Sequence, residues 1–159
     1  MKYLGPLYTP NKFLFSENGV PKGGYKSVKF VRIVDGDTAI FLVDQKEERV
    51  RFFVVNTKET FPNVEPFGEA AKVYTENMLK YAKTIYLQSD PESDLRDDTE
   101  SKRLLAWVWV DYKLLNYLLV EKGYAEVRYI SSKKLMYLQS LYDARKIAKN
   151  KKIRIYSGD

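Results

Sequence analysis

The chain has 159 residues, of which 45% are hydrophobic and 14% aromatic, so it is long and apolar enough to bury the core of one domain. Its charged fraction of 30% is ordinary for a soluble protein and gives no indication of bulk disorder, and its net charge of +6 favours a polyanionic partner such as nucleic acid. Cysteine and histidine are both absent, which excludes disulfides, thiol nucleophiles, zinc sites built on those residues and any histidine general base.

The first 24 residues are predicted to form an irregular arm, because glycine and proline recur throughout them. These residues are Gly5, Pro6, Pro10, Gly19, Pro21, Gly23 and Gly24. The arm has no long apolar run, so we expect neither a signal peptide nor a transmembrane segment in this chain.

Three strands are expected after the arm. Residues 27–33 alternate apolar and polar side chains, residues 38–43 are apolar and β-prone, and residues 49–55 are rich in valine and phenylalanine. The sequence Asp-Gly-Asp at 35–37 predicts the turn between the first two strands, and residues 44–46 form a polar break before the third.

Residues 66–82 are predicted to form the first helix. Pro66 marks its start, because proline is favoured in the first turn of a helix. Ala70, Tyr74 and Met78 follow at helical spacing.

Two further strands are expected over 84–88 and 104–110. The segment between them, 88–101, contains six acidic residues, and we interpret it as a solvated acidic loop. Trp107 and Trp109 are two residues apart and so share one face of the fifth strand. Core packing or a surface patch is favoured for them over base stacking.

A second helix is predicted over 112–122, with leucines along one side and Gly123 as its C-cap. A short extended segment over 125–129 precedes a third helix over 133–149. From residue 131 onward the chain has eight basic and two acidic residues, which accounts for the whole charge excess. Taken alone, this charge run favours a solvated helix face.

Five strands with helices inserted and appended favour a small closed barrel over an open parallel sheet. The predicted fold class is α+β, mainly β: a five-stranded OB-type β-barrel with three helices. The predicted organisation is an N-terminal irregular arm over residues 1–24 and one domain over residues 25–159.

Oxygen-bearing groups that suit a cation follow the first turn and the third strand. Asp37 closes the turn, and Asn56 and Thr57 come directly after the strand. In a closed barrel a turn and a neighbouring strand end meet at one rim. The Asp37 and Asn56 side chains with the Thr57 carbonyl would then suit Ca²⁺, a hard cation. Taken in isolation, Asp-Gly-Asp favours a plain hairpin turn, whereas the later motifs favour the ligand role for Asp37, and Asp35 is expected to be structural.

Charged side chains that suit a phosphate and a water lie nearby in the predicted barrel. Arg51 lies in the third strand and Arg103 precedes the fifth, so two guanidinium groups can fork onto one phosphate. Glu59 lies two residues past Thr57, where it would steer or deprotonate a water. Surface ion pairs for the arginines and a turn carboxylate for Glu59 are the plainer alternatives.

Four motifs, taken in order, resemble those of the staphylococcal nuclease (thermonuclease) family. They are Val34-Asp35-Gly36-Asp37-Thr38, then Arg51-Phe52-Phe53-Val54-Val55-Asn56-Thr57-Lys58-Glu59, then Glu65-Pro66-Phe67-Gly68-Glu69-Ala70-Ala71, then Arg103-Leu104-Leu105-Ala106-Trp107. The run at 153–157 resembles the family's closing segment, so the resemblance covers residues 26–159. One motif alone is weak, whereas four in order and at the right spacing indicate the family and its fold.

The resemblance implies a role for each matching residue. Asp37 matches a calcium-ligand carboxylate, and Glu59 matches the proposed general base. Arg51 and Arg103 match the two arginines that bind the phosphate and stabilise the transition state. Tyr129 matches an aromatic residue of the nucleotide pocket, while its sequence position is equally compatible with the core.

The resemblance also implies a cofactor, partners and a location. It implies bound Ca²⁺, DNA and/or RNA as the substrate, no membrane segment and a monomer. It favours a secreted or cell-surface bacterial protein.

Three departures from the family motifs affect the expected activity. Asn56 stands where the family has its second calcium carboxylate, which removes one negative charge from the ligand set. Lys58 replaces the family's proline, which loosens the turn and adds a positive charge. Glu100-Ser101 replaces a Lys-Tyr pair, which removes a cation and a stacking ring.

Two functional hypotheses follow. The first is a calcium-dependent nuclease that hydrolyses phosphodiester bonds, with a metal site impaired by Asn56. The alternative is a catalytically weak or inactive OB module of this family that binds nucleic acid or a protein partner. We favour the nuclease, because Asp37, Arg51, Glu59 and Arg103 are all present.

Overall fold

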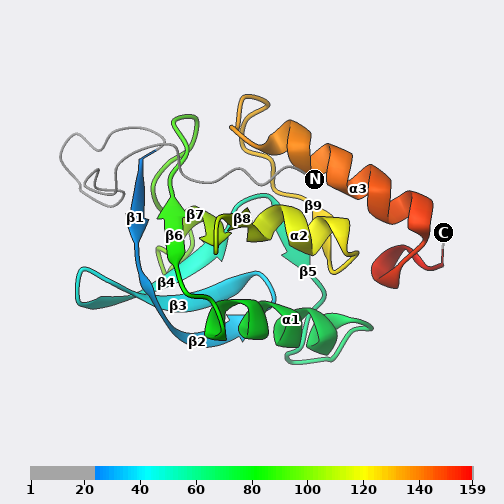
Figure 1. Cartoon of the computed structure of the whole chain (residues 1–159), viewed down its shortest axis with the longest axis horizontal. Coiled ribbons are helices and arrows are strands. Elements are labelled where there is room, and N and C mark those ends of the chain that lie inside the picture. Colours follow the sequence, from blue (N-terminus) through cyan, green and yellow to red (C-terminus); the bar gives the residue numbers. More distant parts are fainter. Residues whose placement is uncertain (1–23, 159) are drawn as a thin grey trace.

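The computed structural model describes residues 24–158 (Figure 1). The elements are β1 (Tyr25–Ser27), β2 (Lys29–Asp35), β3 (Thr38–Val43), β4 (Lys46–Phe52), β5 (Val55–Thr57), α1 (Gly68–Lys80), β6 (Ile85–Gln88), β7 (Leu104–Val110), β8 (Lys113–Leu114), α2 (Leu115–Glu121), β9 (Ala125–Val127), α3 (Leu138–Lys151) and the 3-10 helix η1 (Arg154–Tyr156). Apart from Gly24, the predicted arm of residues 1–24 lies outside the described residues, so the division of the chain at that point stays a prediction.

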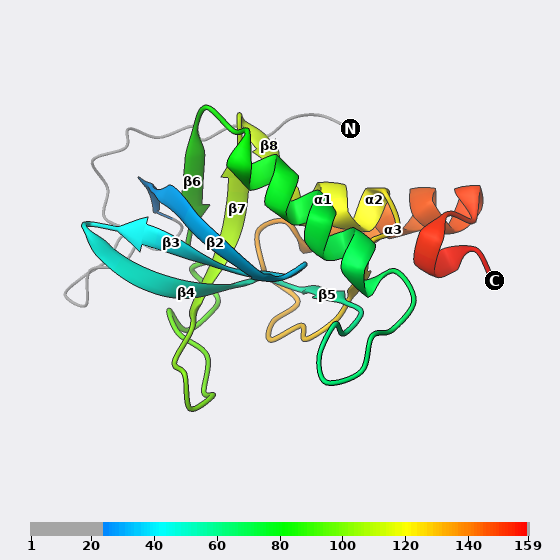
Figure 2. The same cartoon turned by 90° about the horizontal axis from the view of Figure 1, so that it is seen from below.

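Most of the described strands belong to one mixed sheet with the order β1-β6-β7-β4-β3-β2, and β8 pairs with β7. β4 and β7 are parallel, and the other neighbours are antiparallel. β5 and β9 form a separate antiparallel pair. β6 and β7 run across the direction of β2, β3 and β4 (Figure 2). Within residues 24–158 the architecture is α+β, with three α-helices and a mostly β framework, as predicted.

Two predicted strands are divided in the structure. The predicted strand 27–33 is interrupted at Val28, so β1 pairs with β6 and β2 pairs with β3. The predicted strand 49–55 is interrupted after Phe52, because Val54 has φ 65°, outside the extended region. The chain then changes direction, and β5 pairs with β9 instead of the main sheet.

The polar break before β4 is shorter than predicted. Asp44 and Gln45 have φ values of 50° and 68°, as in a two-residue hairpin turn of type I′. β4 therefore begins at Lys46, three residues before the predicted start.

All three helices begin later than predicted, and α2 begins at Leu115 because Lys113–Leu114 form β8. Phe67 has φ 69°, which no α-helical residue adopts, so α1 begins at Gly68 and not at Pro66. α3 begins at Leu138 and not near residue 133. The amide of Lys134 donates to Ser132 Oγ and that of Met136 to Asp90 Oδ2, so these amides do not continue a helix.

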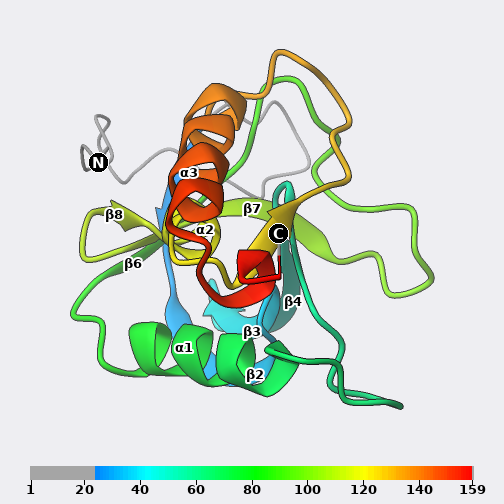
Figure 3. The same cartoon turned by 90° about the vertical axis from the view of Figure 1, so that its right-hand side faces the viewer.

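The core lies between the main sheet and the helices, and α2 packs against both α3 and β7 (Figure 3). Trp107 and Trp109 are fully buried, so the core interpretation of these residues holds. Their indole N–H groups donate to Asp90 Oδ2 and Gln88 Oε1, both at 2.9 Å. Asp90 is itself buried, so the prediction of a solvated acidic loop is wrong at this residue.

Gly123 has φ 74° two residues past the end of α2, as expected for its predicted C-cap role. None of the helices in residues 24–158 has the length and apolar character needed to cross a membrane.

Candidate functional site

One pocket contains all the predicted site residues. Its volume is about 1020 Å³, and it is lined by residues of β2 to β5 and their turns, by Glu59 of the loop 58–67 between β5 and α1, and by the loop 89–103 between β6 and β7. Both loops project on the same side of the molecule (Figure 2). The predicted residues that line the pocket are Asp37, Arg51, Asn56, Thr57, Glu59, Arg103 and Tyr129. The fold therefore brings these side chains together, and their roles remain predictions.

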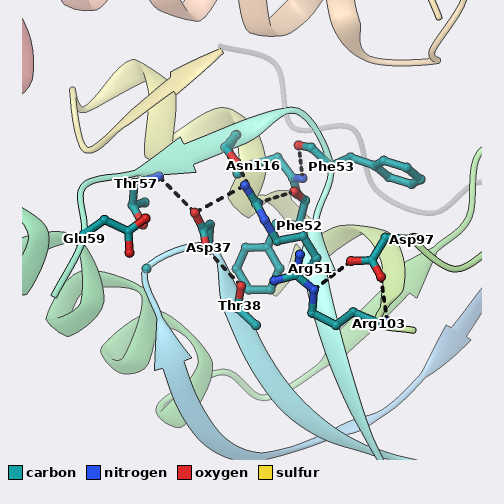
Figure 4. Close-up of polar contacts among 12 residues, drawn as sticks. Asp37, Thr38, Arg51, Phe52, Phe53, Thr57, Glu59, Asp97, Arg103 and Asn116 are labelled. Atoms are coloured by element: carbon teal, nitrogen blue, oxygen red, sulfur yellow. Dashed lines mark hydrogen bonds and ion pairs between the residues drawn. The ribbon is translucent and has the colours of Figure 1, made fainter. Parts of the chain in front are cut away.

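Asp37 lies in the turn between β2 and β3 and contacts two neighbouring strands (Figure 4). Its Oδ2 accepts a hydrogen bond from the Thr57 N–H at 3.0 Å and lies 3.4 Å from Arg51 Nη2. Its Oδ1 accepts a hydrogen bond from Thr38 Oγ1 at 2.9 Å. The carboxylate is almost fully buried, so these partners fix its position at the pocket wall.

Gly36 allows this turn to approach β5 and α1. A Cβ at this position would lie 2.8 Å from Thr57 Cγ2 and 3.0 Å from the Ala71 Cβ. Its carbonyl also accepts a 2.6 Å hydrogen bond from Thr75 Oγ1 in α1. The glycine between the two aspartates is therefore required by close packing, which sets the position of Asp37 against β5.

Arg51 binds both the turn and its own strand. Its Nη1 donates to the carbonyls of Phe52 at 2.9 Å and Val55 at 2.7 Å. These bonds bracket the change of direction between β4 and β5. Burial lowers the pKa of Arg51 from its usual value, and the charge of Asp37 opposes that effect. The positive charge of Arg103 also lowers this pKa, so the two guanidinium groups repel one another. A bound phosphate would relieve that repulsion.

Arg103 is held by an aspartate that the sequence did not single out. Its Nε donates to Asp97 Oδ2 at 2.7 Å, and its backbone N–H donates to Asp97 Oδ1 at 3.0 Å. Hydrogen bonds from Thr99 and Arg103 outweigh burial and lower the pKa of Asp97. Asp97 therefore orients Arg103 as an ionised partner, and the prediction of a solvated loop is wrong at this residue too. The loop contains six acidic residues, and nothing in the sequence indicates which of them contacts Arg103.

Glu59 lies at the pocket mouth on a loop whose two ends are joined. Its N–H donates to Glu65 Oε1 at 2.7 Å, and its carbonyl accepts from the Glu65 N–H at 2.9 Å. The next residue, Thr60, donates through Oγ1 to Asp35 Oδ1 at 2.8 Å. The backbone of Glu59 is thus fixed while its carboxylate is exposed in the pocket.

The negative surroundings of Glu59 affect its protonation. Desolvation, followed by repulsion from Asp35 and Asp37, raises the pKa of Glu59 above the ordinary value of a glutamate. A raised pKa makes a carboxylate a better proton acceptor, which is the property a general base needs.

Tyr129 lies in the pocket and not in the core, which decides between the two alternatives for this residue. Its side chain is 68% exposed, and its ring centroid lies 5.7 Å from Arg51 Cζ and 5.5 Å from Arg128 Cζ. Two guanidinium groups therefore flank one aromatic ring at the pocket edge.

Comparison with known proteins bears directly on this arrangement. A family model described as Staphylococcal nuclease homologue matches residues 49–158. The chain belongs to the staphylococcal nuclease family. It is 30% identical to a thermonuclease of Staphylococcus hyicus over 146 residues, and this aligned region covers 90% of this chain and 83% of that protein.

Further relatives carry similar names. The chain is 34% identical over 134 residues to endonuclease YncB of Bacillus subtilis (strain 168), covering 82% of this chain and 62% of the relative. It is 33% identical over 128 residues to a thermonuclease of Staphylococcus intermedius, covering 79% of this chain and 73% of the relative. Membership of the staphylococcal nuclease family confirms the resemblance inferred from the four motifs.

The departures from the staphylococcal nuclease motifs lie at different places in the structure. Asn56 lines the pocket. Lys58 Nζ lies 3.1 Å from Glu126 Oε1 on β9, so its added positive charge is paired. Glu100 and Ser101 are exposed and do not belong to the pocket lining among the described residues.

Calcium, which the staphylococcal nuclease resemblance implies, fits the kind of donor in this pocket. Within residues 24–158 no group of three or more His, Cys, Asp or Glu side chains is spaced to hold a metal ion. The pocket offers instead the carboxylates of Asp37 and Glu59, the Asn56 amide and backbone carbonyls, all of them oxygen donors. Thr57 Oγ1 is buried beside them with no hydrogen-bond partner. A cation with bound water would balance the negative charge that raises the Glu59 pKa.

Gly68→Ala is expected to disturb the site by displacing the Glu59 loop. A Cβ at Gly68 would lie 2.5 Å from the Glu59 carbonyl oxygen and 3.0 Å from that of Lys58, and both are backbone atoms that must move. We expect a stability loss of about 1–3 kcal/mol from overpacking. Cleavage should fall about tenfold or more, because a 1 Å misplacement can cost about 100-fold.

Urea unfolding and plasmid cleavage measure the two effects of Gly68→Ala. Gly158→Ala is the matched control, because nothing lies within 4 Å of the added Cβ. Equal cleavage by the two variants would contradict the idea that Gly68 sets the position of Glu59.

Proposed function

We propose that this protein is a calcium-dependent nuclease that hydrolyses phosphodiester bonds of DNA or RNA in the pocket described above. The observation that carries the proposal is the convergence of two guanidinium groups, an exposed carboxylate and oxygen donors on one pocket. The names of the relatives, thermonuclease and endonuclease, support the same reaction class.

Each residue has a stated task in this reaction. Arg51 and Arg103 bind the non-bridging oxygens of the scissile phosphate and stabilise the negative charge that develops in the transition state. Glu59 accepts a proton from the attacking water. The water oxygen bonds to phosphorus as the ester bond to the leaving sugar oxygen breaks, and a solvent proton neutralises that oxygen. Tyr129 stacks on a base of the bound nucleotide.

Asp37, Asn56 and the Thr57 carbonyl are the proposed calcium ligands. A bound calcium ion supplies Lewis-acid stabilisation of phosphate charge and lowers the pKa of water. Asp37 is also the ion-pair partner of Arg51 at 3.4 Å, so the same carboxylate orients the phosphate-binding arginine.

The proposed fold is the closed five-stranded OB-type barrel of this family. The strand order supports closure, because β1 and β2 lie at opposite ends of it while Val28 alone separates them in sequence. One continuous segment, residues 25–35, therefore supplies both end strands of the sheet.

A binding module without turnover is the second candidate function, and Asn56 is the observation that favours it. Ca²⁺ affinity depends on the number of charged ligands, and the Asn56 amide is a ligand without charge. We therefore propose that the wild-type protein needs unusually high Ca²⁺, or cleaves slowly, for this reason. We further propose that the protein is monomeric, and secreted or displayed at a bacterial surface.

Asn56→Asp is expected to lower the Ca²⁺ concentration for half-maximal plasmid cleavage by about tenfold or more. This factor corresponds to about 1.4 kcal/mol for the restored carboxylate contact. Lys58→Pro should have a smaller effect, because it changes the turn and removes the ion pair with Glu126 without adding a ligand. Cleavage is followed across a calcium series, with EDTA as the metal-free reference.

Asn150→Asp is the control, because it adds the same charge at an exposed position in α3. Tighter Ca²⁺ binding by Asn56→Asp without any cleavage would favour the binding module. Efficient wild-type cleavage at low Ca²⁺ would show that Asn56 is an adequate ligand.

A further inference from the structure

The loop 58–67 exposes three large apolar side chains beside the pocket. Phe61 is 82% exposed, Val64 is 65% exposed and Phe67 is 38% exposed. Exposed apolar side chains scattered singly are ordinary, whereas several together on one loop indicate a contact surface. Phe61 is the most exposed of the large hydrophobic residues described.

This loop is held in place by hydrogen bonds on both sides of Phe61. Two hydrogen bonds between the Glu59 backbone and Glu65, one to the Glu65 carboxylate and one from the Glu65 N–H, close the loop at its base, and the Thr60 hydroxyl donates to Asp35. The Gly68 N–H donates to the Glu65 carbonyl at 3.0 Å. The phenylalanine ring is therefore presented from a fixed base, which lowers the entropy lost when it contacts a ligand.

The position of Phe61 in the chain places it close to the proposed site of cleavage. Phe61 is two residues from Glu59, so their Cα atoms are at most about 7 Å apart. Stacked neighbouring bases are about 3.4 Å apart, so this Cα separation corresponds to about two stacked nucleotides.

Charge favours passage of the substrate strand along this loop. Residues 60–64 carry no charged side chain. The loop on the other side of the pocket contributes Glu92, Asp94 and Asp98 to the lining, and these carboxylates repel a phosphate backbone. A strand whose phosphate is bound by the two arginines is therefore directed towards residues 60–64 rather than towards these carboxylates.

We propose that Phe61 stacks on an unpaired nucleobase adjacent to the scissile phosphate, as a second aromatic contact besides Tyr129. The proposal rests on the proposed nuclease function, because the strand is positioned by the same phosphate site. An aromatic ring recognises the face of any base, so the contact adds affinity without base preference.

The test measures binding of a fluorescent single-stranded oligonucleotide in Ca²⁺ by anisotropy, with Glu59→Gln as the parent protein to slow turnover. Adding Phe61→Ala should weaken binding about tenfold, within the roughly 5- to 150-fold range expected for loss of one base stack. Phe61→Trp should restore binding, and the oligonucleotide should quench the fluorescence of the new tryptophan.

Two controls separate stacking from other effects. Tyr81→Ala removes an aromatic ring that is 72% exposed at the far end of α1, about 20 Å from the loop, and should leave binding unchanged. An abasic oligonucleotide of the same length should bind the parent and the Phe61→Ala protein equally, because it offers phosphates without bases.

The outcomes distinguish this proposal from the proposed function. If the parent binds the oligonucleotide and Phe61→Ala binds it equally well, the stacking contact is refuted while the nuclease proposal stands. The same holds if Phe61→Ala weakens binding of the abasic strand as much as that of the normal strand. Failure of both the wild type and the parent to bind any oligonucleotide in Ca²⁺ overturns both proposals.

Discussion

Glu59→Gln is expected to lower the rate of phosphodiester cleavage by about 10²- to 10⁴-fold, the usual contribution of a general base. Glutamine has nearly the same shape but cannot accept the proton of the attacking water. The backbone bonds of residue 59 to Glu65 do not involve its side chain, so the loop should keep its conformation. Nucleotide binding in Ca²⁺ should therefore persist in part.

Single-turnover cleavage and nucleotide binding, measured on the same preparation, separate these two effects. Glu69→Gln is the matched control, because it removes the same charge from an exposed position in the first turn of α1. A Glu59→Gln protein that cleaves at the wild-type rate would remove Glu59 from the mechanism. An equal loss of cleavage in Glu69→Gln would show that the effect comes from the change in net charge and not from the general base.

Arg51→Ala and Arg103→Ala are each expected to reduce cleavage by about 10²- to 10³-fold, the cost of removing one preorganised group that stabilises transition-state charge. Their effects on folding should differ. The Arg51 side chain is 12% exposed, and its removal leaves the buried Asp37 carboxylate without its cation. It also removes hydrogen bonds to two backbone carbonyls.

Arg51→Ala should therefore lower the free energy of unfolding by about 3 kcal/mol or more, as when one partner of a buried ion pair is removed. Arg103 is more exposed, and its partner Asp97 keeps other hydrogen-bond donors, so Arg103→Ala should lose less stability. Urea unfolding and cleavage of each variant give the comparison. Similar stability losses with unchanged cleavage in both variants would contradict a phosphate-binding role.

Arg51 is expected to contribute both to folding stability and to phosphate binding. Nη1 donates hydrogen bonds to two backbone carbonyls and so stabilises the fold. The charge of the same guanidinium group acts in the pocket, where it lies close enough to Arg103 to be repelled by it. Arg51→Lys tests this distinction, because lysine keeps the charge but lacks the planar fork that binds two carbonyls and a carboxylate together. We expect an intermediate loss of stability and a loss of cleavage close to that of Arg51→Ala.

Much of the site followed from the sequence because its parts are close along the chain or follow local rules. Asp37 lies in the turn between β2 and β3 and Arg51 in β4, and the pairing of β3 with β4 puts Arg51 opposite Thr38, next to Asp37. Glu59 follows Arg51 by only eight residues. The glycine at position 68 matched a family motif, and the structure gives its reason, which is the backbone of Glu59 passing within a short distance.

Other parts were decided by contacts between distant segments. Lys58 is paired with Glu126, 68 residues later, and only the pairing of β5 with β9 makes that contact possible. Arg96 forms two hydrogen bonds to the Glu48 carboxylate, which fixes the acidic loop against β4. That fixed loop is what brings Asp97 to Arg103.

The sequence by itself determined the order of strands and helices, the family and the cluster around Asp37. These features depend on hydrophobic periodicity, turn chemistry and motif spacing, which act over a few residues. Only the tertiary structure decided where strands are interrupted, where helices begin and which of six loop acids orients Arg103. Those outcomes depend on which backbone amides and charges meet after the chain has folded, and that is set by residues far apart in the sequence.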